Sequence, residues 1–303
     1  SDGLSDETKI KIKVDDINSG YTKSGQKIKK DIEVHKVQIL DPATGTGTFL
    51  AETIKFIKKD FWGGSWSSYV EEHLIPRLNG FELLMASYAM AHLKLDLLLL
   101  ETGYKPSKEQ KRFNIFLTNS LEEHHEQSGN LFASYLANES KEADRVKKDV
   151  PVMVVMGNPP YAVSSSNKNE WIQNLIADYK KDLNERNIQP LSDDYIKFIR
   201  YRQHYIEKNG EEILAYISNN SFIDGIIHRQ MRKSLLECFD KIYILDLHGN
   251  AKKKEVSPDG SKDENVFDIM QGVSINIFIK KKSKSKELAD VYHYDLYGKR
   301  DCK

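Results

Sequence analysis

The sequence predicts an α/β fold with a doubly wound, largely parallel sheet and an antiparallel last strand. Short apolar runs of strand length alternate with helical patterns along most of the chain, and the last two runs have no helix between them. The strand candidates are residues 37–40, 114–118, 150–156, 213–217, 242–247 and 273–279, and the helical patterns cover residues 83–100, 194–207 and 222–239.

The first strand, loop and helix stand out most clearly. Residues 37–40 form an apolar run that ends at Asp41-Pro42, and a glycine loop then leads into a helical pattern. The apolar residues of that pattern are Phe49, Leu50, Ile54 and Ile57. Residues 1–36 ahead of this strand are polar and weakly periodic, which predicts a frayed or loosely packed lead-in. The main domain is therefore expected at residues 37–303.

The later part of the chain predicts one antiparallel strand pair and one long loop. Runs 242–247 and 273–279 are joined by a polar loop rich in glycine and lysine, so we expect an antiparallel pair at one end of the sheet. Residues 162–191 are polar with little periodicity, and we expect a long loop there.

Composition excludes some classes of protein and leaves others open. With 39% apolar residues the chain can form a packed core, and its 45 basic residues balance 45 acidic ones, so charge alone does not suggest a nucleic-acid partner. Cys238 and Cys302 have no CxxC spacing, so we expect no disulfide framework, no metal centre and a cytoplasmic location. No segment approaches the ~20 apolar residues of a membrane span.

The first motif that indicates chemistry is the glycine loop. It reads Asp41-Pro42-Ala43-Thr44-Gly45-Thr46-Gly47-Thr48. The two glycines let the backbone turn sharply and approach a ligand, and the following helix offers N–H groups to a carboxylate or phosphate. A P-loop is excluded because no Lys-Ser or Lys-Thr pair follows, and a dinucleotide fingerprint because Leu50 stands where Gly or Ala is required. A plain tight turn remains the alternative.

The second motif follows the strand candidate at 150–156 and reads Gly157-Asn158-Pro159-Pro160-Tyr161. Two consecutive prolines fix φ and prevent a helix, so the loop presents the Asn158 amide, the Pro159 carbonyl and the Tyr161 ring rigidly. Ligands of open α/β sheets gather at this carboxyl edge. The alternative is that Asn-Pro-Pro is simply a good turn.

Together the two motifs resemble those of DNA adenine-N6 methyltransferases of restriction-modification systems, in particular the large single-polypeptide enzymes. The resemblance covers roughly residues 36–300 and implies a Rossmann-like fold dependent on S-adenosylmethionine. Supporting likenesses are Leu117-Thr118-Asn119-Ser120-Leu121, Tyr195-Ile196-Lys197-Phe198, and Asn265-Val266-Phe267 leading into residues 273–278.

The resemblance implies a set of cofactor-binding residues. They are Asp41, Ala43, Thr44, Gly45, Thr46, Gly47, Thr48, Glu82 and Asn119. Asp41 would lie near the amino group of S-adenosylmethionine, and Glu82 would accept hydrogen bonds from the ribose hydroxyls. Glu82 is also compatible with an exposed glutamate that favours a helix N-terminus. Asn119 stands where the family more often has Asp, and its amide oxygen can still accept a bond from the adenine amino group.

The resemblance also implies the catalytic roles. The Asn158 side-chain oxygen and the Pro159 carbonyl would hold the two N–H bonds of the target N6, freeing its lone pair to attack the methyl group. Tyr161 would stack on a flipped base, with its ring important and its hydroxyl incidental. Phe267 matches the second stacking aromatic and is equally compatible with a core position.

Double-stranded DNA is the expected partner, together with the remaining domains of a larger polypeptide: a target-recognition domain, with nuclease and helicase modules as candidates. Two alternatives stay open. Asn-Pro-Pro-Tyr also occurs in methyltransferases that act on protein glutamine or RNA guanine, and a non-catalytic scaffold for DNA binding could retain the same fold. The basic runs at 252–254 and 280–282 are interpreted as solvated loops.

Overall fold

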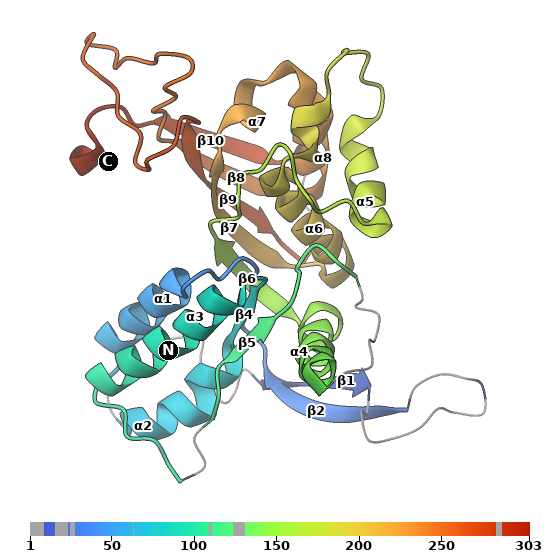
Figure 1. Ribbon diagram of the computed structural model, residues 1–303, viewed down its shortest axis with the longest axis vertical. Helices are drawn as coiled ribbons and strands as arrows, with labels where there is room; N and C mark the ends of the chain where they lie inside the picture. Colours follow the sequence, from blue (N-terminus) through green and yellow to red (C-terminus); the bar gives the residue numbers. More distant parts are fainter. Residues whose placement is uncertain are drawn as a thin grey trace. The chain divides into compact units, whose positions relative to one another are not determined.

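The computed structural model describes residues 9–15, 24, 28–62, 64–108, 111–123, 131–282 and 287–303. By the contacts within the chain, it falls into two units, Ser1–Met156 and Gly157–Lys303 (Figure 1).

The first unit begins with a hairpin instead of the loose lead-in that we predicted. Strands β1 (Lys9–Asp15) and β2 (Lys29–His35) pair antiparallel, with Ile12 opposite Ile32. Lysine alternates with isoleucine and valine along β1, so its apolar side chains share one face. Val14 on that face is 1% exposed. The alternation covers only seven residues and three of them are lysine, so the sequence pattern indicates only weak periodicity there.

Four parallel strands form the sheet of the first unit. They are β3 (Gln38–Asp41), β4 (Leu78–Glu82), β5 (Asn114–Leu117) and β6 (Val152–Gly157), in the order β6-β3-β4-β5. Strand β3 pairs parallel with both β4 and β6. This confirms the predicted parallel sheet, and it places the carboxyl ends of β3, β4 and β5 at one edge.

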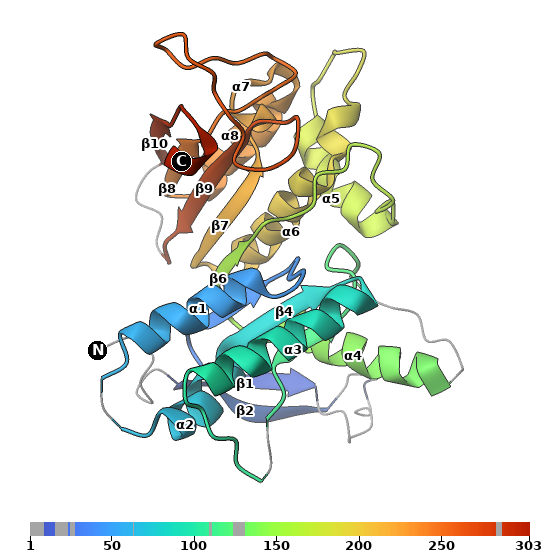
Figure 2. The ribbon, with the colours of Figure 1, turned by 60° about the vertical axis from the view of Figure 1, so that its left-hand side comes forward.

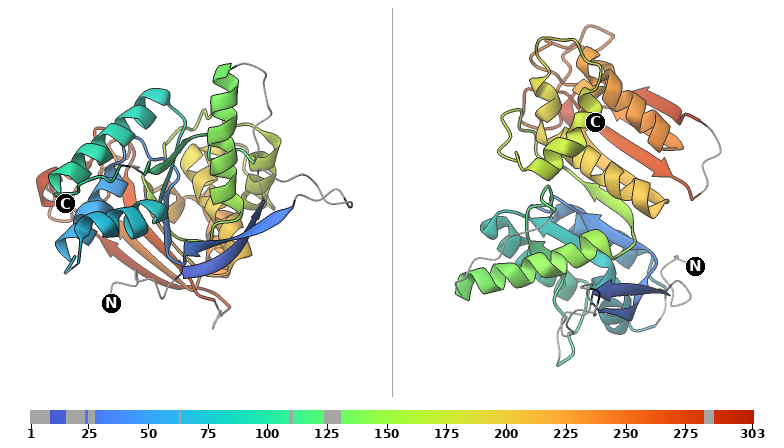
Figure 3. Two further views of the ribbon diagram at one scale, coloured as in Figure 1. Left: turned by 90° about the horizontal axis from the view of Figure 1, so that it is seen from below. Right: turned by 90° about the vertical axis from the view of Figure 1, so that its right-hand side faces the viewer.

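Helices cover both faces of this sheet. Helices α1 (Thr48–Lys59) and α3 (Met85–Glu101) run side by side on one face (Figure 2). A chain of short helical segments, α2 (Trp66–Tyr69), η2 (Val70–Leu74) and η3 (Ile75–Arg77), packs into the same apolar core. Helix α4 (Leu131–Lys148) lies on the opposite face, against β5 (Figure 3).

The second unit has four strands of mixed direction. They are β7 (Glu212–Asn219), β8 (Lys241–Asp246), β9 (Val273–Lys280) and β10 (Asp290–Asp295), in the order β10-β8-β9-β7. The predicted antiparallel pairing of β8 with β9 is confirmed. The pair does not lie at the end of the order, because β10 adds to β8 in parallel. We did not predict β10, whose side chains are mostly exposed as expected of an edge strand.

The helices of the second unit depart from the predictions at two places. Helix α5 (Glu170–Lys180) lies in the stretch expected to be a loop; its buried Ile172, Ile176 and Tyr179 recur at helical spacing. The helix predicted at 222–239 is broken into α7 (Ser221–Asp224), η5 (Ile226–His228) and α8 (Arg229–Cys238). The break falls at Gly225, where an added Cβ would lie 2.5 Å from the Ser221 carbonyl oxygen.

The remaining elements are α6 (Asp194–Asn209), which was predicted, and the short turns η4 (Gln189–Ser192) and η6 (Arg300–Cys302). Among the described residues, no helix combines the length and apolar character needed to cross a bilayer.

A fully buried ion pair joins α6 to β7. Arg202 donates two hydrogen bonds to Glu212, from Nε over 3.0 Å and from a terminal nitrogen over 2.5 Å, and the side chains are 1% and 0% exposed. Burial raises the pKa of Glu212 to about 7, although the Arg202 charge acts in the opposite direction. The glutamate therefore depends on its partner to remain ionised in the core.

We expect Arg202→Leu to lower the free energy of unfolding by about 3–5 kcal/mol, because it leaves the Glu212 carboxylate buried without its partner. Urea unfolding followed by circular dichroism near neutral pH measures this. The exposed pair of Lys233 and Glu237 provides the control, since Lys233→Leu should change stability by less than about 1 kcal/mol. Equal effects of the two substitutions would contradict the role of the buried pair.

Candidate active site

The glycine loop, residues 41–47, leaves the end of β3 and leads directly into α1. Gly45 and Gly47 have φ of 55° and 78°, in the left-handed region that favours glycine. Gly47 N–H donates to the Thr44 carbonyl oxygen over 2.8 Å, which closes the turn. Gly47 is the N-cap of α1 and no side chain caps the helix, so the backbone at the helix start can face a ligand.

Thr44 fastens this loop to the neighbouring strand β4. Its N–H donates to the Phe81 carbonyl oxygen over 3.0 Å, and its hydroxyl donates to the Asp41 carbonyl oxygen over 2.9 Å. A Cβ added to Gly80 would lie 2.5 Å from the Thr44 hydroxyl oxygen. Gly80 is thus needed for the close approach of loop and strand, a role that we did not predict.

Glu82, at the end of β4, binds the loop through its carboxylate. Oε2 accepts the Gly45 N–H over 2.7 Å, and Oε1 accepts the Leu84 N–H over 2.8 Å. The side chain is half-buried. Each oxygen can accept one further hydrogen bond, so the carboxylate keeps acceptor capacity for hydroxyl groups of a ligand. Glu82 therefore does more than complement a helix N-terminus: it positions the glycine loop.

Asp41 is completely buried at the start of the loop. Its Oδ1 accepts the Ala43 N–H over 3.1 Å, whereas Oδ2 is buried with no hydrogen-bond partner. Burial raises the pKa of Asp41 to about 7; the Ala43 N–H opposes this rise and the negative charge of Glu82 adds to it. A buried carboxyl group with a free oxygen is suited to a cationic ligand group.

Asn119 lies in the loop after β5 and is 9% exposed. Its Oδ1 accepts the Leu121 N–H over 3.0 Å, and its Nδ2 donates to Glu122 over 2.9 Å. The amide thus shapes its own turn. The next residue, Ser120, donates from its hydroxyl to the Pro42 carbonyl oxygen over 2.5 Å and so joins this turn to the glycine loop. Direct contacts therefore bring Asp41, Glu82 and the Asn119 turn into one group of the first unit.

The second motif forms a loop at residues 158–161, the 158–161 loop, in the second unit. Asn158 is exposed, Pro159 is buried and Tyr161 is half-buried. The Tyr161 hydroxyl donates to Asn158 Oδ1 over 2.8 Å and lies 3.3 Å from the Ile217 carbonyl oxygen on β7. Burial raises the pKa of Tyr161, and the negative charge of Asp193 raises it further. We predicted that this hydroxyl is incidental, whereas in the structure it donates to the amide that we predicted to be catalytic.

Phe267, the second predicted aromatic, lies on the segment between β8 and β9. Its N–H donates to Asn265 Oδ1 over 2.9 Å, and the residue is half-buried and so is not part of the core. The side chain lines a pocket of about 700 Å³ together with Asn250, Met270 and Arg300. The core interpretation of Phe267 is therefore not supported, while stacking on a base stays a prediction.

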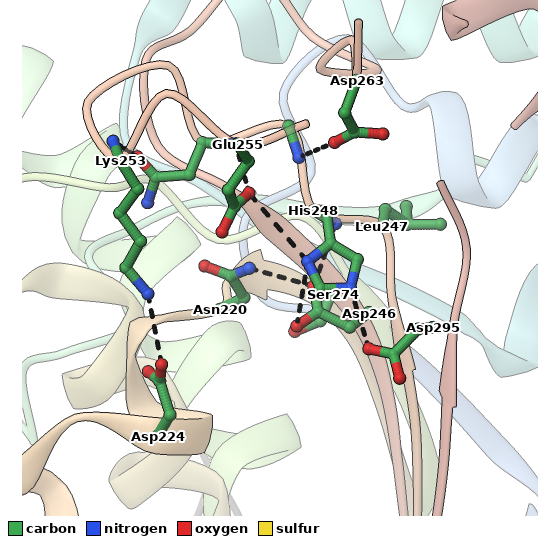
Figure 4. Close-up of polar contacts among 12 residues, drawn as sticks. Asn220, Asp224, Asp246, Leu247, His248, Lys253, Glu255, Asp263, Ser274 and Asp295 are labelled. Carbon is green, nitrogen blue, oxygen red and sulfur yellow. Dashed lines mark hydrogen bonds and ion pairs between the residues drawn. The ribbon is translucent and has the colours of Figure 1, made fainter. Parts of the chain in front are cut away.

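A cluster of ionisable side chains lies near this segment, at the end of β8 (Figure 4). His248 Nε2 is 2.8 Å from Asp295 Oδ1, and the His248 ring stacks on Tyr297 with 4.0 Å between centroids. Asp246, His293 and Asp295 place possible metal ligands within 4.8 Å of one another. Two of these three residues are exposed and Asp295 already pairs with His248, so we do not assign a metal site.

The fold is an α/β fold in which a glycine loop follows the parallel strand β3 and the Asn-Pro-Pro-Tyr loop follows the parallel strand β6, as in methyltransferases that use S-adenosylmethionine. The chain belongs to the family described as MmeI, DNA-methyltransferase domain, whose model matches residues 20–244. The fold class and the family resemblance predicted from the sequence are thereby confirmed. No curated protein sequence matches the chain.

Solved structures agree with this family. The chain is similar to the ATP-dependent Type ISP restriction-modification enzyme LlaBIII bound to DNA, with 29% identity and a TM-score of 0.71 over 86% of this chain and 18% of that one. A nuclease-deletion mutant of the Type ISP enzyme LlaGI with a DNA substrate mimic gives 26% identity and a TM-score of 0.72, over 88% and 22%. The structure of the DrdV-DNA complex gives 29% identity and a TM-score of 0.66, over 86% of this chain and 25% of that one. The chain thus spans a quarter or less of these proteins.

We expect Glu82→Gln to loosen the glycine loop, because a carboxamide has one acceptor oxygen for the two N–H groups that Glu82 now binds. Loss of a charged hydrogen bond, worth about 1.5–3 kcal/mol, should speed amide exchange at Gly45 by about tenfold to a hundredfold. Hydrogen exchange read by mass spectrometry or NMR measures this. Glu52→Gln, which removes an exposed carboxylate paired with Lys55, is the control and should leave Gly45 unchanged. Unaltered exchange in Glu82→Gln would refute the positioning role.

Proposed function

We propose that this chain is the methyltransferase core of a larger restriction-modification polypeptide and that it methylates the N6 amino group of adenine in double-stranded DNA. Membership of a DNA-methyltransferase family supports the substrate class. The observation that carries the reaction is the exposed Asn158 amide, held by Tyr161 beside the Pro159 carbonyl. The family favours DNA over protein glutamine or RNA guanine, and the intact 158–161 loop argues against a scaffold without activity.

The residues of the first unit fit S-adenosylmethionine. The buried Oδ2 of Asp41 lacks a hydrogen-bond partner, which suits the amino group of the methionine part. The left-handed turns at Gly45 and Gly47 allow a ligand to approach the backbone, and Glu82 retains acceptor capacity for ribose hydroxyls. S-adenosylmethionine, when bound, supplies a methyl group on a positively charged sulfur. Ala43, Thr44, Thr46, Thr48 and Asn119 complete the proposed binding set.

The chemistry required of the second unit is orientation. The lone pair of an adenine N6 is delocalised into the ring, which makes the nitrogen a poor nucleophile. Asn158 Oδ1 and the Pro159 carbonyl oxygen can accept its two N–H bonds, and Oδ1 keeps a lone pair for this purpose after accepting the Tyr161 hydroxyl. This geometry frees the lone pair, so positioning and electrostatics replace a strong general base.

A target adenine must leave the duplex to reach this loop, and stacking stabilises the flipped base. The half-buried Tyr161 ring is the proposed first face, and Phe267, in its pocket on the segment between β8 and β9, is the proposed second. We further propose that the two units act as one methyltransferase domain over residues 37–303. Recognition of the target sequence would lie in other domains of the polypeptide, with nuclease and helicase modules as candidates.

We expect Asn158→Ala, made in the longest natural polypeptide that contains this chain, to slow methyl transfer by about 10²–10³-fold, the effect of deleting one oriented polar group. Cofactor affinity should stay the same, because Asp41 and Glu82 are untouched. Transfer of a labelled methyl group to double-stranded DNA, followed by nucleoside analysis, measures the rate and the product. A methylated base other than N6-methyladenine would refute the adenine assignment.

Cofactor binding should depend on pH through Asp41. Its pKa of about 7 means that the protonated form dominates below neutrality, and only the ionised form pairs with a cationic amino group. Affinity for S-adenosylhomocysteine should therefore fall by about tenfold between about pH 8 and about pH 6. Calorimetric titration of the chain measures this, and Asp41→Asn should bind weakly with little pH dependence. An unchanged pH dependence in Asp41→Asn would remove Asp41 from the site.

A further inference from the structure

We propose that Asp193 is a positioning residue that, together with the Tyr161 hydroxyl, holds the Asn158 amide in its working orientation. This inference deepens the proposed function and rests on it. Asp193 directly precedes α6 and lies more than thirty positions along the chain from Asn158. Its side chain nevertheless contacts the backbone immediately after the 158–161 loop.

The 158–161 loop needs such support because sheet bonding ends with β6 at Gly157. Two prolines restrict the backbone of the loop, but they do not fix the side-chain torsions of Asn158, which is exposed. An amide that rotates freely would present its oxygen and its nitrogen to a bound amino group in turn. Only the oxygen can accept an N–H bond, so the orientation of the amide decides whether the loop can act.

The Tyr161 hydroxyl selects one orientation of this amide. It donates to Asn158 Oδ1 over 2.8 Å and lies 3.3 Å from the Ile217 carbonyl oxygen on β7. A hydroxyl donor favours the rotamer that brings the amide oxygen toward it, and the contact with β7 gives the ring a rigid neighbour. The Tyr161 ring also meets the ring of Tyr195 edge to face, with 6.1 Å between centroids and 87° between planes.

Asp193 fixes the backbone on the other side of Tyr161. Its Oδ1 accepts the Ala162 N–H over 2.7 Å, and the residue is 3% exposed. Burial raises the pKa of Asp193, and the hydrogen bond from the Ala162 N–H and the position at the start of α6 both oppose this rise by favouring the ionised form. A short, charge-assisted bond to a buried acceptor anchors the chain directly beyond the tyrosine.

The first turn of α6 also holds the residues that follow. Asp194 Oδ1 accepts hydrogen bonds from the Ser165 hydroxyl over 2.5 Å and from Asn167 Nδ2 over 3.1 Å. Lys197, 1% exposed, donates to Ser165 and to the Asn167 carbonyl oxygen. This explains the likeness that the sequence showed at the start of α6, which the proposed chemistry alone leaves without a role. The anchored segment begins at Ala162, directly after the 158–161 loop.

Three variants in the full polypeptide test the proposal. Tyr161→Phe keeps the ring and removes the hydroxyl, Asp193→Ala removes the acceptor, and Asp193→Asn keeps a neutral acceptor oxygen. We expect Tyr161→Phe and Asp193→Ala to lower kcat for methyl transfer by about tenfold to a hundredfold, the effect of misplacing a positioned group, with KM for the cofactor unchanged. Asp193→Asn should recover much of the loss. The double variant should lose less than the product of the single effects, because both act on one loop.

Amide hydrogen exchange tests the same variants without relying on enzyme activity. Amide exchange at Ala162 should be faster in Asp193→Ala than in the parent chain, and Asp193→Asn should lie between them. Asn169→Ala is the matched structural control: Asn169 caps α5 in the same unit by accepting the Ile172 N–H over 3.0 Å. It should lower stability without changing kcat per folded molecule or exchange at Ala162.

The outcomes separate this inference from the proposed function. If Asn158→Ala slows methylation as expected while Tyr161→Phe and Asp193→Ala keep parental kcat and Asp193→Ala keeps parental exchange at Ala162, the positioning role is wrong and the function stands. If Asn158→Ala itself has no effect, the proposed function fails first. Should Asp193→Ala not fold, the kcat of Tyr161→Phe and the exchange of Asp193→Asn still decide the matter: parental values in both overturn the inference.

Discussion

The hydrogen bond from Gly45 N–H to the Glu82 carboxylate is the contact on which the arrangement of the first unit depends. Parallel pairing of β3 with β4 brings the ends of both strands to one edge, but it does not fix the loop that leaves β3. Glu82 supplies that fixation from the end of β4 together with the bond from the Thr44 N–H to the Phe81 carbonyl oxygen, and Gly80 allows the loop to approach the strand. Because the same turn leads into α1, the helix start is placed by this bond too, whereas the buried Asp41 is placed by the pairing of β3 with β4.

The second unit uses the same physical device for a different loop. In each case a carboxylate from another part of the chain accepts a hydrogen bond from a backbone N–H. Glu82 accepts the Gly45 N–H within the glycine loop, and Asp193 accepts the Ala162 N–H directly after the 158–161 loop. Both carboxylates therefore accept hydrogen bonds from the backbone. A backbone donor cannot rotate away as a lysine side chain can, so such bonds fix chain position better than surface ion pairs do.

The sequence predicted those parts of the fold that local pattern determines. Buried strands such as β3 are continuous apolar runs, and the glycine loop and the 158–161 loop are recognisable from residue type and spacing. The hairpin, α5 and β10 were missed because their apolar positions are few and separated by lysine or other polar residues. The supporting roles of Gly80 and Asp193 could not be predicted, since each depends on a contact between segments far apart in the sequence.

The glycine loop of the first unit and the 158–161 loop of the second differ in how their ionisable groups respond to pH. Burial raises the pKa of Asp41 to about 7, so the charge that would attract a cationic ligand changes near neutrality. Burial also raises the pKa of Tyr161, but a phenol whose pKa rises stays protonated and remains a hydrogen-bond donor throughout that range. The hydrogen bond from Tyr161 to Asn158 should therefore not vary with pH around neutrality. Of Asp41 and Tyr161, only Asp41 changes its charge in that range, because burial raises both pKa values but only the carboxyl group is brought near 7.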